Sequence, residues 1–358
     1  MSRSAPRRRA VLAGLGLGGA TLAAPAVAQG RRRWRMATAW PNKLPGPGIS
    51  AARIAERIGT LSGGRLTVEL FPAGVLAPGL GVFDVVASGG VELGHAASVF
   101  WSGKRSAAPL FTSAPFGLTP WEHLSWIEAG GGQAAWDALY DAFGVRAFLG
   151  GNTGPSMGGW FRREIGGLDD LKGLKMRISG LGAEVMRGLG VSPQTLAPGE
   201  IFGALQSGVV DAAEFAGPAA DAALGLDRAA SFYYGPGFHE PNGASETLVS
   251  RAAFDALPGD LQAIVAAASR EEHGIGLAVA ERDNAAALTD LAAARGVAIK
   301  AWPEAVVRAA RAEAEGALET AAAGEPESAR TVESFREALG RARRTAEIAY
   351  APFLAARG

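Results

Sequence analysis

Apolar and polar residues alternate along residues 66–70 and 174–179, which is the pattern of strands with one buried face. Residues 34–39 should form an earlier strand. After that strand, Ile54, Ile58 and Leu61 fall on one face of a helix that should end near Gly63 and Gly64. An order of strand, helix and strand predicts parallel sheets with helices on both faces, and ligands at the carboxyl ends of the strands. We therefore expect an α/β fold.

The stretch 174–179 places a charged residue beside a predicted core. Its apolar residues should face inward, while Arg177 points the other way. A guanidinium at such a place offers a planar fork that matches a carboxylate. The strand pattern alone is equally consistent with a solvated or ion-paired surface arginine.

A pattern near residue 80 returns near residue 200. Ala-Pro-Gly at 77–79 leads to Phe83, and Ala-Pro-Gly at 197–199 leads to Phe202, each followed by a Ser-Gly pair and an apolar stretch. Each copy is typical of a turn, a short helix that begins near proline, and a strand. The repetition predicts two lobes built alike, and 358 residues are enough for two domains.

The expected division of the chain follows from these patterns. Lobe I should comprise residues 31–154 and 243–282, and lobe II residues 155–242 and 283–302. The pair Asn242-Gly243 is a plausible turn where the chain crosses between the lobes. Residues 303–358, rich in Ala, Glu and Arg, should form a C-terminal helical region with a break at 324–326.

Residues 1–28 have the features of a signal peptide. Three arginines at 7–9 precede an apolar run, and Ala-Val-Ala at 26–28 has the form of a signal-peptidase site. The run is too short to span a bilayer, so we expect export to the periplasm without a permanent anchor. The paired arginines permit the twin-arginine route, and a general secretory signal is the alternative.

Composition excludes several classes of function. Lys and Arg number 35, as do Asp and Glu, and the leader holds four of the arginines. The mature chain is therefore slightly acidic, which argues against nucleic acid as a partner. The chain has no cysteine, so disulfides and thiolate chemistry are excluded. The four histidines (His95, His123, His239 and His273) lack the spacing of zinc ligands.

One motif is consistent with an enzyme. Residues 154–158 fit the G-x-S-x-G nucleophile elbow around Ser156, and Asp211 or Glu214 and then His239 follow in hydrolase order. An elbow requires a strand directly before the serine and a helix directly after it. The residues after Ser156 look extended, so the sequence favours a binding protein over a serine hydrolase.

The chain resembles the solute-binding proteins of tripartite ATP-independent periplasmic (TRAP) transporters, in the branch that takes up 2-oxo acids and related small carboxylates. The resemblance rests on the order and spacing of several segments, which are 62–66, 115–118, 151–154, 157–161, 170–177, 208–214 and 232–241. It covers nearly all of the chain after the leader and weakens after about residue 300. It implies a two-lobed periplasmic binding protein fold with a cleft between two similar α/β domains.

The resemblance also implies roles for particular residues. Arg177 should hold the ligand carboxylate with two nitrogens, and Glu214 with the backbone of Phe215 should hold a sodium or calcium ion that bridges protein and ligand. Glu240 should approach the same cleft, as a further ligand of the ion and of the substrate. A cation explains why carboxylates stand beside an anionic ligand, because without one they would repel it. Oxygen ligands favour sodium or calcium over transition metals.

Three positions depart from the family pattern. Ser156 stands where relatives carry Gln, Phe215 replaces their Trp, and Phe100 lies in a loop that lacks their tyrosine hydroxyls. Ser156, Phe215 and Phe100 remain expected substrate contacts, and Trp40 could wall the cleft. Fewer polar contacts predict a roomier, more apolar cleft and a ligand larger than pyruvate.

The expected partners are a small organic carboxylate and the membrane subunits of a TRAP permease. Some relatives pair through a terminal helix, so the resemblance allows a homodimer. A receptor of the same shape that feeds a sensor is a further alternative.

Overall fold

Two β-sheets organise the part of the chain that follows the predicted leader. The computed structural model describes residues 1–2 and 30–358, so the signal peptide expected at 1–28 lies almost entirely outside the described residues. Residues 31–358 form one compact unit. The first sheet has the order β2-β1-β3-β10-β4 and the second the order β11-β9-β5-β8-β6-β7. The two-lobed α/β fold expected from the sequence is confirmed, and the lobe boundaries given above stay a prediction.

The strands of the two sheets are short. The first sheet comprises β1 (Arg32–Thr38), β2 (Leu66–Phe71), β3 (Leu93–Ala96), β4 (Val145–Asn152) and β10 (Ala244–Ser250). The second comprises β5 (Gly159–Phe161), β6 (Lys175–Arg177), β7 (Ser192–Gln194), β8 (Ala212–Ala213), β9 (Phe232–Gly235) and β11 (Ala298–Ala301).

The sheets are mixed, whereas the sequence predicted parallel ones. In the first sheet β10 runs antiparallel to β3 and β4, and in the second β5 runs antiparallel to β8 and β9. Both exceptions have the same cause. Strands β5 and β10 each follow a strand of the other sheet with no helix between, so each enters its sheet from the side at which the other strands end. Strand β11 crosses over after the long helix α9 and runs parallel to β9. Asn242-Gly243 lies between β9 and β10, where the chain makes the return crossing.

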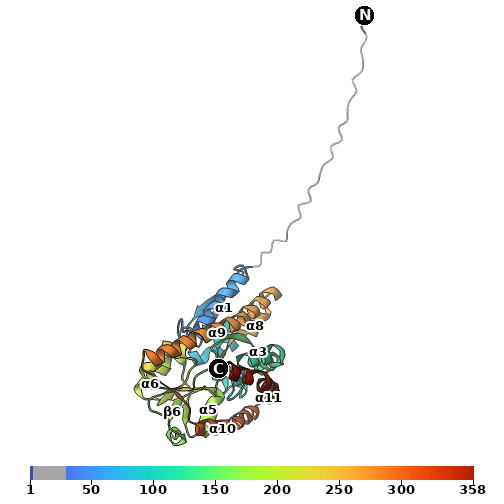
Figure 1. Cartoon of the computed structure of the whole chain (residues 1–358). Coiled ribbons are helices and arrows are strands. Elements are labelled where there is room, and N and C mark those ends of the chain that lie inside the picture. The colour runs from blue at the N-terminus through green and yellow to red at the C-terminus, as the bar shows by residue number, and fades with distance from the viewer. Residues whose placement is uncertain (3–29) are drawn as a thin grey trace. The chain divides into compact units, whose positions relative to one another are not determined.

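Helices cover the sheets on their outer faces (Figure 1). They are α1 (Pro47–Leu61), α2 (Val82–Ala87), α3 (Pro120–Ala129), α4 (Gly132–Tyr140), α5 (Gly180–Gly188), α6 (Ile201–Ser207), α7 (Pro218–Leu224), α8 (Arg251–Asp255), α9 (Gly259–Ala293), α10 (Glu304–Ala322), α11 (Pro326–Thr345) and α12 (Ala351–Arg357). No described helix has the length and hydrophobicity to span a membrane.

Helix α9 joins the two halves of the molecule. With 35 residues it packs on α1 and β4 of the first sheet and on α7 beside the second. Glu272 accepts hydrogen bonds from Ser50 and Arg53 on α1, at 2.7 and 2.6 Å. Further along, Asn284 donates to the Thr153 carbonyl at 3.0 Å and accepts from the Ala219 amide at 3.1 Å. The helix is thereby pinned to both halves.

The repeated segments form the predicted units. Residues Gly79–Gly81, α2 and β3 make the first, and Pro198–Glu200, α6 and β8 make the second. The two Ala-Pro-Gly turns also face each other. A Cβ atom placed on Gly79 would lie 3.5 Å from the Cβ of Ala197, and one on Gly199 would lie 3.7 Å from Cγ of Pro41. The repeats are therefore a contact between the halves as well as a shared local structure.

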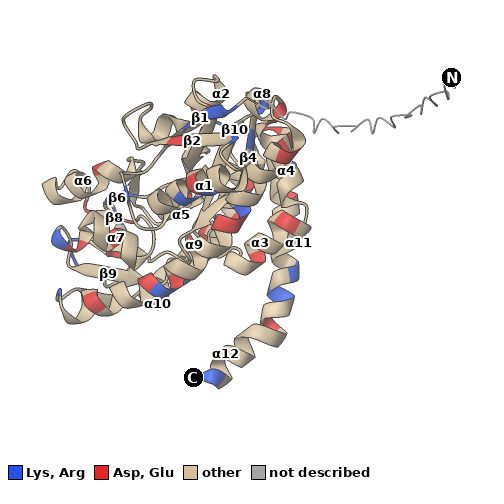
Figure 2. Ribbon diagram, turned by 90° about the horizontal axis from the view of Figure 1, so that it is seen from above, with Lys and Arg blue, Asp and Glu red and all other residues tan. Residues whose placement is uncertain are grey.

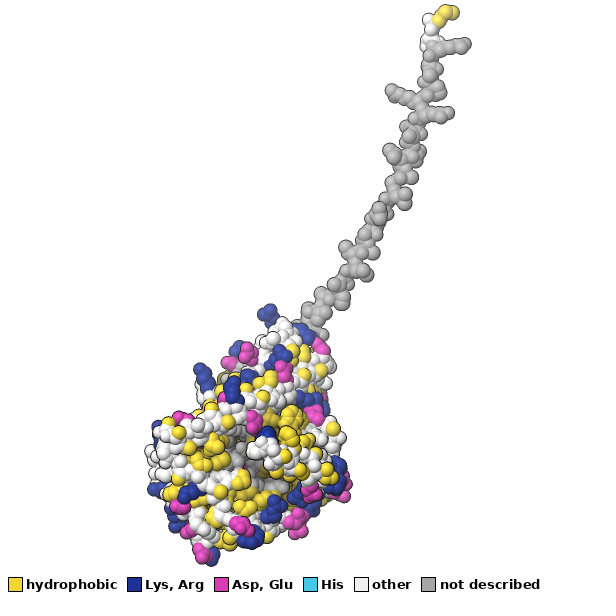
Figure 3. Space-filling view, in the orientation of Figure 1, with side chains coloured by type: hydrophobic (Ala, Val, Ile, Leu, Met, Phe, Trp, Pro, Cys, Tyr) yellow, Lys and Arg dark blue, Asp and Glu magenta, His cyan; other side chains and the backbone are white. Residues whose placement is uncertain are grey.

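Charged residues are spread without a basic face. Figure 2 shows both signs interspersed along α9, α10 and α11, and the face in Figure 3 is equally mixed. Such a surface agrees with the balance of 35 basic and 35 acidic residues in the sequence.

A carboxyl group is buried in the core beside the first sheet. Glu246 on β10 accepts a hydrogen bond from Nε1 of Trp101, and the hydroxyl of Tyr140 lies 3.2 Å from its other oxygen. Neither neighbour carries a positive charge. Burial raises the pKa of Glu246 to about 8, and its two hydrogen bonds oppose that rise only in part.

The substitution Glu246→Gln is expected to remove part of the pH dependence of stability. An unfolded glutamate titrates at about pH 4.3, so between there and about pH 8 the folded chain holds a proton that the unfolded chain has released. The free energy of unfolding must then fall as the pH rises through this window. We expect a fall on the order of 2–4 kcal/mol that the neutral amide lacks.

Urea unfolding at about pH 5 and about pH 9 measures the difference. The control is Glu69→Gln, a solvent-exposed position on β2 at the edge of the same sheet. Its free energy of unfolding should change with pH as that of the wild type does. Parallel pH curves for the wild type and Glu246→Gln would contradict the prediction.

Candidate ligand-binding site

A small cavity lies where the ends of strands from the two sheets meet. Its volume is about 50 Å³, room for only a few water molecules. Trp40 after β1, Phe100 after β3 and Thr153 after β4 line it from one side, and Arg177 on β6 and Glu214 after β8 line it from the other. These are the positions at which open α/β sheets bind ligands.

Arg177 is buried and fixed at the edge of the cavity. Only 2% of the residue is exposed. Its Nη1 donates to the carbonyl oxygen and to Oε1 of Glu214, at 2.6 and 2.8 Å, and Nε donates to the Leu196 carbonyl at 3.3 Å. Nη2 makes no hydrogen bond to any residue that the structure describes. Two of the three guanidinium nitrogens therefore bond to the protein. Only Nη2 remains for a ligand, whereas the resemblance implied that two nitrogens would hold the ligand carboxylate.

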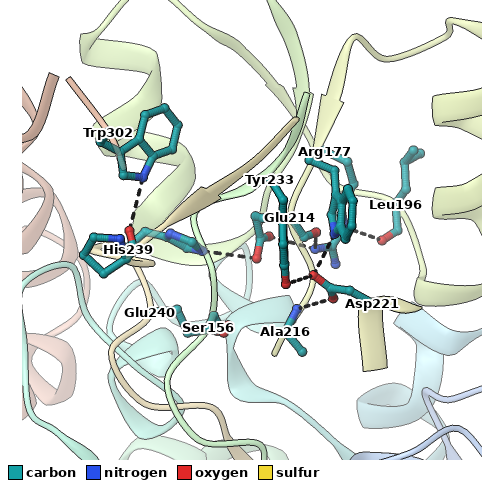
Figure 4. A network of polar contacts seen from close by, with 12 residues as sticks. Ser156, Arg177, Leu196, Glu214, Ala216, Asp221, Tyr233, His239, Glu240 and Trp302 are labelled. Carbon is teal, nitrogen blue, oxygen red and sulfur yellow. Dashed lines mark hydrogen bonds and ion pairs between the residues drawn. The ribbon is translucent and has the colours of Figure 1, made fainter. Parts of the chain in front are cut away.

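Three ionisable groups cluster next to the arginine (Figure 4). Glu214, His239 and Glu240 each have a potential metal-ligand atom within 4.8 Å of the others. Nε2 of His239 lies 3.2 Å from Oε2 of Glu214. The two carboxyl groups are those that the family resemblance assigned to a cation, whereas His239 was not among the predicted ligands.

The surroundings shift the pKa values of Glu214, His239 and Glu240 in different directions. Burial alone would raise the pKa of Glu214, but the charge of Arg177 and the contact with His239 hold that pKa below its ordinary value. Burial would likewise lower the pKa of His239, but Glu214 raises it. Burial and the charge of Glu214 raise the pKa of Glu240 to about 7. The carboxylate of Glu214 therefore balances Arg177.

The segment that carries Glu214 and Phe215 is held from behind by Asp221. Its carboxyl accepts hydrogen bonds from Nε1 of Trp160, the hydroxyl of Tyr233 and the amide of Ala216, at 2.9, 2.8 and 3.1 Å. Burial raises the pKa of Asp221 to about 7. This network fixes the backbone at which the sequence predicted a metal-binding carbonyl, that of Phe215.

Ser156 lies behind the cavity rather than on it. Its hydroxyl donates to Oε2 of Glu240 at 2.6 Å, so it contacts a predicted ligand-binding residue and not the cavity itself. The hydrolase geometry is absent as well. The serine lies between β4 and β5 with no helix directly after it, and His239 bonds to Glu214 instead of Ser156.

Aromatic rings form another part of the cavity wall, and the ring of Phe215 also lies 5.8 Å from Cζ of Arg177. The ring of Trp40 lies 6.0 Å from that of Phe100 and 6.4 Å from that of Phe215, measured between centroids. All three side chains line the cavity, where the sequence analysis expected them. The roomier cleft that the sequence analysis also expected stays a prediction.

Sequence reasoning missed the support of this wall. Buried His95 on β3 accepts a hydrogen bond on Nδ1 from Nε1 of Trp40 at 2.6 Å, and its Nε2 lies 2.7 Å from the Gly150 carbonyl. Burial lowers the pKa of His95 to about 4, so the ring is neutral and its Nε2 donates to the carbonyl. A single histidine in a strand gives no sign of such a partner 55 residues away.

Comparison with known proteins identifies the family of this chain. Residues 37–324 match the family of bacterial extracellular solute-binding proteins, family 7. A monocarboxylate 2-oxoacid-binding periplasmic protein from a Nostoc species is 44% identical over 279 residues, which cover 78% of this chain and 76% of the relative.

Solved structures show the same fold. A TRAP solute-binding protein from Bordetella bronchiseptica, a dimer with copurified calcium and picolinate, is 34% identical with a TM-score of 0.87, over 90% of this chain and 96% of the relative. One from Pseudoalteromonas atlantica with bound sodium and pyruvate is 35% identical with a TM-score of 0.87, over 91% and 99%. The resemblance found in the sequence is thereby confirmed, and the chain belongs to family 7 of the bacterial extracellular solute-binding proteins, the solute receptors of TRAP transporters.

Proposed function

We propose that this protein is an exported solute receptor that binds a small 2-oxo or 2-hydroxy acid between its two halves and delivers it to a TRAP permease. The observation that carries the proposal is Arg177, a buried guanidinium that lines a cavity of about 50 Å³ and whose Nη2 has no hydrogen-bond partner among the described residues. Water is largely excluded there, so a charge-assisted hydrogen bond to a carboxylate contributes about 1.5–3 kcal/mol. The small volume favours an acid of a few carbon atoms.

A cation completes the proposed site. Glu214 already balances the charge of Arg177, and an anionic ligand then requires further positive charge. Carboxylate oxygens of Glu214 and Glu240 and the carbonyl of Phe215 are ligands suited to sodium or calcium. The Bordetella and Pseudoalteromonas relatives hold calcium with picolinate and sodium with pyruvate, respectively. The ion would neutralise the carboxylates and attract the acid.

The receptor is proposed to act without chemical change of its ligand. The hydroxyl of Ser156 donates a hydrogen bond to Glu240, and no histidine among the described residues forms a hydrogen bond with this hydroxyl. Export would follow from the signal peptide expected at 1–28. A receptor that feeds a sensor would share this site, and a pull-down of the membrane partner separates the two cases.

We also propose a homodimer built on the C-terminal helices. Figure 2 shows α12 standing away from the body, and Ile348, Tyr350, Phe353 and Leu354 at this end are more than half exposed. A groove of about 1120 Å³ between α3 and α11 has Tyr350, Phe353, Leu354 and Trp121 on its walls. In Figure 3 hydrophobic side chains gather at the centre of the face where Figure 1 places α11 and the C-terminus. A second copy offers the same helix in return, and two-fold exchange would bury both apolar surfaces.

Arg177→Ala should abolish the thermal stabilisation that pyruvate or another 2-oxo acid gives the wild type. Loss of one partner in a buried charge contact costs about 2–5 kcal/mol, a decrease in affinity of at least thirtyfold. Arg177→Lys should also fail to bind, because an ammonium cannot reach the Leu196 carbonyl, Glu214 and a ligand together. Arg187→Ala, on the exposed face of α5, is the control. A carboxylate response that survives in both Arg177 variants would reject the site.

Removal of sodium and calcium should weaken binding of the acid by at least about tenfold, because the uncompensated carboxylates would then repel it. Titration calorimetry after dialysis against a chelator in potassium buffer measures the loss, and added calcium or sodium should restore the affinity. Glu214→Gln should lose this response, while Glu184→Gln on α5 should keep it. Equal affinity with and without the ions would remove the cation from the proposal.

Truncation after Thr345 should convert the dimer into a monomer, since it removes all four exposed apolar residues of the terminal helices. Light scattering on a sizing column gives the mass of each form. The acid should still bind to the truncated chain, because none of the removed residues lines the cavity. A full-length protein that runs as a monomer at micromolar concentration would rule out the dimer.

A further inference from the structure

Two serine hydroxyls on the cavity have no partner in the protein. Ser113 comes shortly after the turn Ala108–Phe111, and Ser179 follows β6 on the opposite side of the cavity. The residues are 5% and 9% exposed, and neither Oγ makes a hydrogen bond with any residue that the structure describes. Two threonine hydroxyls on the same cavity are engaged. That of Thr112 bonds to Ser98, and that of Thr153 donates to the Gly243 carbonyl.

An unpartnered buried hydroxyl is costly, at about 1–3 kcal/mol each. Such groups are rare in folded proteins, and they are explained by water, an ion or a ligand that satisfies them. Two of them on opposite walls of one small cavity indicate that the cavity is built for something with oxygen atoms.

The backbone around Ser179 shows why its hydroxyl is free. Ser179 is the residue before the first turn of α5, where a serine usually caps the helix, but its side chain makes no capping bond. Its backbone instead bonds to the carboxylate of Glu214. The residue is thus held beside the ion pair with Arg177, on the wall of the cavity. Leu181 and Gly182 in the first turn of α5 also line the cavity, so the positive end of the helix dipole lies there.

We propose that Ser113 and Ser179 determine specificity by binding the oxygen on the carbon next to the ligand carboxylate. The inference rests on the proposed function, in which Arg177 and a cation hold the carboxylate. In a cavity of about 50 Å³, the second carbon of an acid so held lies between the two walls. A hydroxyl donates to a keto oxygen, and it can both donate to and accept from a ligand hydroxyl. The site would therefore accept 2-oxo and 2-hydroxy acids and discriminate against the unsubstituted acid of the same length.

Three acids of equal length separate this effect from binding in general. Pyruvate, lactate and propionate are titrated by calorimetry into the full chain and into Ser113→Ala, Ser179→Ala and the double variant, with calcium or sodium present. Each lost hydrogen bond should weaken pyruvate and lactate by about tenfold, whereas propionate should bind all four proteins within about twofold. The preference for the 2-oxygen should therefore shrink in each single variant and vanish in the double one.

Two further variants make the result specific to these hydroxyls. Ser98→Ala removes a buried hydroxyl that bonds to Thr112 and does not line the cavity, so it should keep the wild-type preference. Ser179→Thr retains a hydroxyl and should keep most of the preference. Thermal unfolding without ligand verifies that every variant is folded.

The outcomes distinguish this inference from the function on which it rests. If the wild type binds none of the three acids, both fail. If the acids bind and the serine variants weaken propionate as much as pyruvate, the serines only shape the site and the inference is wrong. It is also wrong if the variants leave all affinities unchanged, because the hydroxyls then hold water alone.

Discussion

The buried ion pair between Arg177 and Glu214 is the constraint around which the rest of the site is arranged. Removing two charges from water costs several kcal/mol per ion, and their attraction repays this only when the remaining donors and acceptors are satisfied. The protein meets the requirement at Nε and Nη1 of the arginine, and Nη2 is left facing the cavity. The arginine is thus buried, at a cost in free energy, at a place where an anion can bind to its remaining donor.

The neighbours of the pair extend the same principle. His239 supports the ionised form of Glu214, Asp221 fixes the backbone after β8, and Ser156 holds Glu240 at the edge of the cluster. His239, Asp221 and Ser156 are themselves buried. A change in any of them shifts the charge balance that an incoming acid would meet, so specificity is distributed beyond the residues that touch the ligand.

The sequence was informative where a short-range pattern reports on the fold. Alternation in 174–179 placed Arg177 off the core face, and the repeated Ala-Pro-Gly segments predicted two similar halves. The family resemblance brought Glu214 and Glu240 together, as the structure does. Contacts between distant segments gave no such signal. His95 reaches Trp40, and Ser113 and Ser179 line one cavity, across stretches of chain that no local pattern connects. Helix α9 was missed because its buried face includes Ser269, Glu272 and His273, which interrupt the apolar stripe in the sequence.

The meeting of the two Ala-Pro-Gly turns has a mechanical consequence. A Cβ atom placed on Gly79 would make ordinary van der Waals contact with Ala197, and one placed on Gly199 would do so with Pro41. The two halves can therefore approach at this point by only about the width of a methyl group, and the turns limit the smallest gap between the halves. These turns therefore limit how small the space for a solute can become, whether or not a solute is bound.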